Sequence, residues 1–219
     1  FAYSFVCGHI LLNQLQVKML KQYCIENEDI YVIPNTVDKE QTNFEAEDFI
    51  YDSDYLSMVC RLSPEKGVHI AIRAVALIPT YERPHLVIAG DGPQSDELKS
   101  LVDELNINEY VKFLGSVGHS TALGVIKSST LNICSSVIFN GIQDTAPLSV
   151  LESIALEVPV AASIIGGLPE YVKDNKTGYL FEQGNDKALS EIIISHLKKK
   201  RDGNLSAFNI GLKGCSNKL

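Results

Sequence analysis

The sequence lacks the short patterns that assign proteins to several common classes. It contains no C-x-x-C, H-x-x-x-H, H-E-x-x-H or G-x-S-x-G, so we expect neither a His- or Cys-based metal site nor the nucleophile elbow of a hydrolase. Every apolar run is far shorter than the roughly 18 residues of a membrane-spanning helix. The formal net charge of −8 argues against general affinity for nucleic acid, and no nucleic-acid partner is expected.

The cysteines and the first residues bear on where the protein works. The five cysteines are odd in number and widely spaced, which favours reduced thiols in a cytoplasmic protein over disulfides. Residues 1–12 lack the basic start and the small-residue cleavage site of a signal peptide. Because the first residue is Phe1 and not Met, we expect the chain to be part of a longer protein.

Residues 143–157, QDTAPLSVLESIALE, are the most informative stretch. With Pro147 as the first helical residue, they predict a helix with Thr145 as a capping candidate. Glu152 then falls among apolar positions, where an unpaired carboxylate would be very costly. We therefore expect a hydrogen-bond partner for Glu152 and propose a ligand. A core helix with Glu152 at its exposed rim stays open as the alternative.

The start of this helix also predicts an anion site. The N–H groups of Leu148 and Ser149 are free at the positive end of the helix. Asp144 lies in the loop that enters the helix, eight residues before Glu152. One short stretch thus offers an anion site with an acid on each side of it.

From Tyr55 onward, short apolar runs alternate with helical patterns. This alternation is typical of βαβ units, so the sequence predicts an α/β fold with a doubly wound, parallel, Rossmann-like sheet. Ligands of such sheets bind beyond the carboxyl ends of the strands. The predicted strands are 55–60, 85–89, 111–114, 130–135, 159–163 and 178–181. The predicted helices are 67–78, 94–105, 120–128, the one at Pro147, a short one from Pro169, and 186–200.

The residues before Tyr55 have a different character. Residues 9–26 carry apolar side chains at helical spacing and predict an amphipathic helix, and residues 30–33 predict a short strand. The acidic and polar composition of 39–54 suits a linker. We therefore divide the chain into residues 1–38, which belong to a preceding unit, the linker 39–54, and the sheet domain 55–219.

Two cations follow the first strand of the sheet domain. Arg61 comes directly after this strand and Lys66 stands at the start of the next helix, in RLSPEKG (61–67). Both lie on the expected ligand side, where the fork of an arginine and the ammonium of a lysine could bind a diphosphate. Two solvated loop charges are the alternative.

Three further patterns are short. GDGP (90–93) lacks the third glycine of a dinucleotide fingerprint, so it predicts a tight turn whose glycines allow close approach of a ligand or of neighbouring backbone. The double glycine at 166–167 allows the same, or forms a plain turn. DSD (52–54) looks like a D-x-D metal motif, but it precedes its strand and would face away from the ligand.

Together these patterns resemble the C-terminal, donor-binding half of the glycogen-synthase-like retaining glycosyltransferases of family 4, which have the GT-B fold. The resemblance covers about residues 31–185, in the order of the family. The two acids of the family's E-x7-E pattern are Asp144, in place of the usual Glu, and Glu152; the stretch 136–144 is longer than usual. The matching segments are VIPNTVD (32–38), RLSPEKG (61–67), LVIAGDGP (86–93), VKFLGSV (111–117), DTAPLSVLESIALEVPVAAS (144–163) and GGLPEYVKDNKTGYLF (166–181).

The resemblance implies a hexosyltransferase that binds a nucleotide-diphosphate sugar and transfers the sugar with retention. It implies no cofactor and no metal, since two cations and a helix end would balance the diphosphate. The implied catalytic residues are Arg61, Lys66, Asp144 and Glu152, with Glu152 on the ribose and Asp144 on the sugar. The implied donor-binding residues are Arg61, Lys66, Gly90, Phe113, Leu114, Gly115, Asp144, Thr145, Ala146, Pro147, Leu148, Ser149 and Glu152, with the backbone of 113–115 at the base.

The family also needs an N-terminal acceptor domain, of which residues 1–38 look like the last helix and strand. We therefore expect this chain to bind donor weakly and to transfer nothing by itself. The acceptor of the full protein would be a saccharide or lipid-linked saccharide, with peripheral contact at the inner face of the membrane. Two alternatives stay open: a nucleotide-sugar 2-epimerase on the same architecture, and a non-catalytic nucleotide-sugar-binding or interaction domain.

Overall fold

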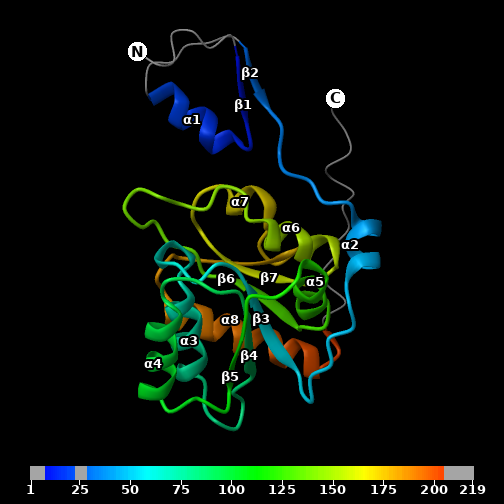
Figure 1. The fold of residues 1–219 in the computed structure, drawn as a ribbon, viewed down its shortest axis with the longest axis vertical. Helices are drawn as coiled ribbons and strands as arrows, with labels where there is room; N and C mark the ends of the chain where they lie inside the picture. Colours follow the sequence, from blue (N-terminus) through cyan, green and yellow to red (C-terminus); the bar gives the residue numbers. More distant parts are fainter. Residues whose placement is uncertain (1–7, 23–28, 205–219) are drawn as a thin grey trace.

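The computed structural model describes residues 8–22 and 29–204. Its main element is a six-stranded parallel sheet (Figure 1). The strands lie in the order β5 (Val111–Gly115), β4 (His85–Ala89), β3 (Tyr55–Val59), β6 (Leu131–Cys134), β7 (Val160–Ser163) and β8 (Gly178–Phe181). The chain adds β4 and β5 on one side of β3 and then returns to place β6 on the other side. The strand order therefore reverses between β3 and β6, where doubly wound sheets bind their ligands.

Helices cover both faces of the sheet, as the predicted doubly wound fold requires. Apolar side chains of α3 (Val68–Leu77), α4 (Ser95–Glu104) and α8 (Asp186–Arg201) pack on one face in a large buried cluster. Side chains of α5 (His119–Lys127), α6 (Leu148–Ala155) and α7 (Leu168–Tyr171) pack in two smaller clusters on the other. Strand residues such as Leu86 and Val87 alternate between these clusters because successive side chains of a strand point to opposite faces. The predicted fold class is confirmed.

A small unit precedes the sheet domain and differs from its prediction. Residues 9–26 were expected to be one helix, but His9–Leu11 form strand β1, which pairs in parallel with β2 (Ile30–Val32). The helix α1 begins only at Gln14 and runs to Gln22. Long-range pairing with β2 gives the backbone of His9–Leu11 its hydrogen bonds, and the helical spacing of side chains cannot reveal such a partner. The predicted helix end, 23–26, lies outside the described residues.

The acidic stretch 39–54 contains a helix that its composition does not predict. Helix α2 (Lys39–Glu45) is capped by Asp38, whose carboxylate accepts hydrogen bonds from the N–H groups of Glu40 and Gln41. Lys39 forms an ion pair with Glu157 just after α6, so α2 lies against the sheet domain. The start of this segment is therefore docked on the sheet domain. Within the described residues, no helix combines the length and hydrophobicity needed to cross a bilayer.

Candidate functional site

A small pocket of about 10 Å³ lies at the carboxyl ends of β3 and β6, where the strand order reverses. It joins the loop between β3 and α3 to the loop between β6 and α6. These two loops leave a doubly wound sheet in opposite directions at this point, which opens a crevice between them. The lining residues are Met58, Val59, Cys60, Lys66, Ile133, Cys134, Ser136, Asp144, Pro147 and Ser149.

Lys66 reaches this pocket because of the turn that follows it. The residues Pro64–Lys66 form a short 3-10 helix, η2, and Gly67 ends it with a φ of +60°, in the left-handed region that glycine adopts at little cost. A Cβ on Gly67 would lie 2.0 Å from the carbonyl oxygen of Ser135. The hydroxyl of Ser135 donates to the carbonyl of Gly67 at 2.9 Å. The glycine thus lets the Lys66 turn pack directly against the end of β6.

Lys66 and Asp144 form an ion pair in the pocket. Their Nζ and Oδ1 atoms are 2.5 Å apart, and the hydroxyl of Ser136 donates to the other carboxylate oxygen. Burial by itself lowers the pKa of the Lys66 ammonium, but the hydrogen bond and the negative charge of Asp144 outweigh burial and raise it. Lys66, which is predicted to bind phosphate, and Asp144, which is predicted to contact the sugar, are therefore partners of each other in this structure.

The N-terminus of α6 faces the same pocket with unpaired amides. The helix begins at Leu148, with Pro147 as its N-cap, one residue later than predicted. Among the residues that the structure describes, no side chain caps this helix, so the expectation for Thr145 is wrong. Thr145 lies two residues before the N-cap, too early to reach the first turn. Within residues 8–22 and 29–204, the N–H groups of Leu148 and Ser149 have no acceptor. They remain available to an anion.

Glu152 has a protein partner that the sequence does not reveal. Glu152 is only 9% exposed, as its place among apolar positions predicts. The Nε2 atom of His119, the first residue of α5, lies 3.0 Å from Glu152 Oε1. The Nδ1 atom of the same ring lies 3.4 Å from Glu45 Oε2 on α2. A contact between residues 33 positions apart leaves no local signal, so a ligand was the partner proposed from the sequence.

The base end of the predicted site lies two strands away. The N–H of Gly90 donates to the carbonyl of Gly115 at 2.8 Å, which joins the ends of β4 and β5. Phe113 and Leu114 pack against the clusters on opposite faces of the sheet, so their backbone is what this edge offers to a ligand. A Cβ on Gly90 would lie 1.9 Å from the carbonyl oxygen of Cys60. This glycine is therefore required by its neighbouring strand, whatever else binds there.

The loop that carries Asp144 is held through its backbone by Gly166 and by two asparagines that precede the sheet domain. A Cβ on Gly166 would lie 1.7 Å from the carbonyl oxygen of Asp144, so this glycine allows close approach of backbone. The side-chain amide of Asn13 donates to the carbonyl of Thr145 at 2.8 Å, and that of Asn35 to the carbonyl of Ala146 at 3.4 Å. Thr145 and Ala146 are thus held through their backbone by the small N-terminal unit.

Two predicted features lie apart from the pocket. Arg61 follows β3, but its side chain is exposed, does not line the pocket and, among the described residues, takes part in no hydrogen bond or ion pair. Asp54 of the DSD motif lies before β3, at the opposite end of the strand, and pairs with Lys200 at 2.7 Å. In the part of the chain that the structure describes, no group of three or more His, Cys, Asp or Glu is arranged to hold a metal.

Cys60 and Cys134 line the pocket as neutral thiols. Burial raises the pKa of Cys60 to about 12 and that of Cys134 to about 11, and the negative charge of Asp144 adds to both shifts. A thiol with such a pKa carries almost no thiolate at neutral pH. These cysteines therefore act as small apolar walls and not as nucleophiles.

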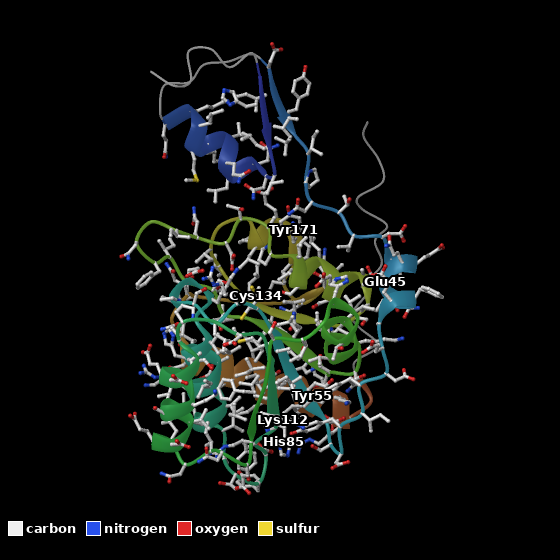
Figure 2. All side chains as sticks on the ribbon, in the orientation of Figure 1. Glu45, Tyr55, His85, Lys112, Cys134 and Tyr171 are labelled. Carbon is white, nitrogen blue, oxygen red and sulfur yellow. The ribbon has the colours of Figure 1, made fainter. Side chains whose placement is uncertain are left out.

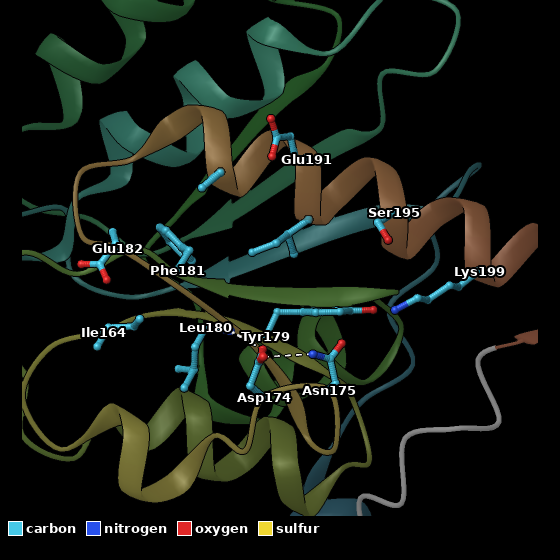
Figure 3. Close-up of a pocket in the computed structure, with 12 residues that line it drawn as sticks. Ile164, Asp174, Asn175, Tyr179, Leu180, Phe181, Glu182, Glu191, Ser195 and Lys199 are labelled. Carbon is cyan, nitrogen blue, oxygen red and sulfur yellow. Dashed lines mark hydrogen bonds between the residues drawn. The ribbon is translucent and has the colours of Figure 1, made fainter.

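Larger hollows exist elsewhere but carry none of the predicted chemistry. One of about 550 Å³ runs between the edge strand β8 and α8 (Figure 3). Its Asp174 already accepts hydrogen bonds from the side chain of Asn175 and the N–H of Leu180. Another of about 600 Å³ lies between α3 and α4, beside Phe139. Neither contains a residue predicted to bind the donor, so chemistry and not size selects the pocket at β3 and β6.

Comparison with known families decides what kind of domain this is. The family described as "Glycosyl transferases group 1" matches residues 39–207, more than half of the chain. The chain belongs to this glycosyltransferase family. Two curated relatives are similar to it: the N-acetyl-alpha-D-glucosaminyl L-malate synthase of Bacillus anthracis, 28% identical over 87% of this chain and 49% of its own, and an uncharacterized glycosyltransferase of Methanocaldococcus jannaschii, 30% identical over 74% of this chain and 44% of its own. The chain thus spans about half the length of these glycosyltransferase relatives.

Solved structures agree on the fold of this glycosyltransferase domain. The chain superposes on Anabaena HepE in complex with UDP-glucose with a TM-score of 0.78 and 24% identity, covering 95% of this chain and 59% of that one. It superposes on a sucrose-phosphate synthase from Thermosynechococcus elongatus with a TM-score of 0.76 and 19% identity, covering 92% and 51%. The sheet domain therefore has the architecture of the C-terminal half of a GT-B fold, which confirms the resemblance inferred from the sequence.

Proposed function

We propose that this chain binds the nucleotide-diphosphate sugar donor of a retaining glycosyltransferase that needs no metal. One observation carries the proposal: the ammonium of Lys66, the carboxylate of Asp144 and the N-terminal end of α6 converge at one pocket where the strand order reverses. Among the described residues, the first two amides of α6 have no acceptor. The ammonium and the amides suit a diphosphate. A carboxylate that accepts hydrogen bonds suits the hydroxyls of a sugar.

Residues on either side of the pocket would bind the base, the ribose, the diphosphate and the sugar in the order in which they occur in the donor. The backbone of 113–115 would meet the base, and Glu152, close to the start of α5, would accept hydrogen bonds from the ribose hydroxyls. The diphosphate would lie between Lys66 and the first amides of α6, with the sugar at Asp144. The ends of β5 and β3 are two strand spacings apart, about 10 Å, which leaves room for a nucleoside. Arg61, exposed at the end of β3, is free to add a second cation.

The Lys66–Asp144 ion pair suggests how donor binding prepares the site. A phosphate that reaches the pocket competes with Asp144 for the ammonium of Lys66. When Lys66 turns to the phosphate, the carboxylate of Asp144 loses that partner and can accept from sugar hydroxyls. As the bond between sugar and phosphate breaks, negative charge grows on the diphosphate, where Lys66, Arg61 and the positive end of α6 stabilise it.

The site that binds the acceptor would lie in a part of the enzyme that these residues do not include. Since the chain spans about half the length of its curated relatives, the transfer itself is proposed for a longer protein. Its acceptor would be a saccharide or lipid-linked saccharide, with peripheral membrane contact. The chain alone should bind donor weakly and show no transfer. Product formation by the isolated chain would contradict this last point.

A thermal-shift panel tests the binding. UDP, GDP and ADP, each alone and as a hexose conjugate, are added to the chain with and without EDTA. At about ten times its Kd, the matching nucleotide should raise the unfolding midpoint by about 4 °C. The shift should survive EDTA. No shift from any nucleotide would refute the proposal, and a shift that needs added Mg²⁺ would refute its metal-independent form.

A second measurement separates the proposal from the two alternatives. A protein that contains the whole of this chain and its preceding domain is incubated with the donor that binds, and the products are analysed by mass spectrometry and NMR. Glycoside formed with the anomeric configuration of the donor supports retaining transfer. Donor epimerised at C2 would identify an epimerase, and binding without any reaction would identify a binding domain.

A further inference from the structure

His119 stands between two carboxylates from two different elements. It is the first residue of α5, and its two ring nitrogens lie 3.0 Å from Glu152 on α6 and 3.4 Å from Glu45 on α2. Both partners are carboxylates, which accept hydrogen bonds from ring N–H groups. The ring therefore links the two acids through its two nitrogens.

This contact is what fixes the carboxylate of Glu152. In the described part of the chain, no other side chain or N–H group donates to it. The bond engages Oε1, while Oε2 has no partner among those residues. The side chain of Glu152 is 12% exposed, so the carboxylate is nearly buried but still reachable from the site. One oxygen is thus held by the protein while the other is left for a ligand.

The ring of His119 is itself held in place from α2. Glu45 contacts its outer nitrogen, and α2 is anchored beside α5 by Glu47, whose carboxylate accepts from the hydroxyls of Ser120 at 2.8 Å and Thr121 at 2.9 Å. A ring that is 62% exposed would otherwise be free to rotate away from Glu152. The acidic segment before β3 therefore reaches the nucleotide site through one histidine.

We propose that His119 is a positioning residue for ribose recognition. It orients Glu152 so that the second carboxylate oxygen faces the ribose hydroxyls, and Glu45 in turn orients His119. This rests on the proposed function, in which Glu152 binds the ribose. The expected consequence is specific: loss of His119 weakens the preference for ribose over 2′-deoxyribose and leaves the diphosphate contacts unchanged.

The test compares the Kd of UDP with that of 2′-deoxy-UDP by calorimetry, and uses GDP with 2′-deoxy-GDP if the chain prefers guanine. The unchanged chain should bind the ribonucleotide about tenfold more tightly, the size of one hydrogen bond to a charged group. His119→Leu should reduce this ratio to about twofold, while His119→Gln, which keeps a donor near the position of Nε2, should preserve most of it. Pyrophosphate affinity, measured alongside, should be the same in all three.

Two variants of the α2 segment provide the matched control. Glu45→Gln weakens the hold on the ring and should lower the ratio to between those of the unchanged chain and His119→Leu. Glu40→Gln removes the same charge from an exposed position of α2 that does not contact His119, and it should leave the ratio unchanged. If His119→Leu does not fold, Glu45→Gln against Glu40→Gln decides the matter by the same criterion.

The outcomes distinguish a failure of this inference from a failure of the proposed function on which it rests. An unchanged ratio in His119→Leu, or an equal loss of affinity for UDP, 2′-deoxy-UDP and pyrophosphate, overturns the positioning role while nucleotide binding stands. A parent chain that binds nucleotides without preferring ribose overturns the role of Glu152 and with it that of His119. A parent chain that binds no nucleoside diphosphate overturns the proposed function as well.

Discussion

The two ends of the parallel strands differ in the hydrogen-bonded ionisable side chains that they bury. At the amino end, Tyr55 and His85 stand at the first positions of β3 and β4, gathered with Lys112 in Figure 2, whereas Cys134 marks the carboxyl end of β6. The Tyr55 hydroxyl donates to the carbonyl of Val125 at 2.8 Å, and burial raises its pKa. At the carboxyl end, Lys66 and Asp144 form an ion pair, and the hydrogen bond to Asp144 helps to raise the pKa of Lys66.

His196 shows the character of the amino end most clearly. It is fully buried; its Nε2 lies 2.9 Å from the carbonyl oxygen of Thr130, and its Nδ1 lies 3.3 Å from the hydroxyl of Tyr179. Since the carbonyl can only accept, Nε2 carries the proton and Nδ1 accepts from Tyr179. Burial lowers the pKa of His196 to about 4 and raises that of Tyr179 to about 12. Both groups are neutral at pH 7.

The difference teaches which end serves stability and which serves binding. Neutral groups with satisfied hydrogen bonds can be buried at little cost, and they join strands and helices at the amino end. Charged groups in partial burial need partners, and a pair of opposite charges can exchange one partner for a ligand. At the carboxyl end, such a pair lies beside amides of α6 that have no acceptor within the described part of the chain. The following predictions probe this contrast, from the largest expected effect to the smallest.

Acid should destabilise the chain through the amino end. The pKa of His196 is about 4 in the folded chain against an ordinary 6.5, so the unfolded chain binds the proton more readily. Its contribution to stability is complete above pH 6.5 and is lost as the pH falls from 6.5 to 4, by up to about 3 kcal/mol. Urea unfolding at several pH values measures this loss. His196→Gln should flatten the slope in this window, and an equal slope in both proteins would contradict the assignment.

Lys66→Met should weaken nucleoside diphosphate binding about 100-fold, or about 2.7 kcal/mol, because it removes a charge-assisted contact in a partly buried site. It should also lower the free energy of unfolding, since Asp144 loses its cation. Calorimetric titration with UDP and urea unfolding measure the two effects. Lys99→Met, at an exposed lysine of α4, is the matched control and should change neither.

Arg61→Ala should separate binding from stability at the same end. We expect nucleoside diphosphate affinity to fall by about 2 kcal/mol if the guanidinium grips the phosphates. The free energy of unfolding should stay within about 0.5 kcal/mol, because the side chain is exposed. Arg73→Ala, at an exposed position of α3, serves as control. Unchanged UDP affinity on titration would remove Arg61 from the site.

Asp144→Asn should have the smallest effect and the opposite sign. Without the carboxylate, Lys66 no longer has a competing partner, so UDP should bind about threefold more tightly. UDP-glucose should gain less than UDP, because the contact with the sugar is weakened. The ratio of the two Kd values, measured by calorimetry, is the quantity to follow. Weaker binding of UDP would show that Asp144 helps the diphosphate site and does not compete for it.

Local pattern was sufficient for the sheet domain. Every predicted strand and helix from Tyr55 onward exists, with ends that agree or differ by at most two residues, because apolar periodicity and glycine turns act within a few positions. The same logic failed at His9–Leu11, where pairing with β2 overrode a helical pattern, and at α2, which its composition alone did not reveal. Local rules cannot contain partners that are distant in the sequence.

The sequence by itself determined the doubly wound architecture, the family, and the stretch 143–157 as the centre of interest, since turns and helix starts are encoded locally. Only the tertiary structure decided which groups meet. It paired Lys66 with Asp144, 78 positions away, and brought the hydroxyl of Ser136 to the same carboxylate. It also paired Glu152 with His119. These contacts depend on the reversal of strand order between β3 and β6 and on helices packing over it. A charge is therefore visible in the sequence, but its partner is set by the fold.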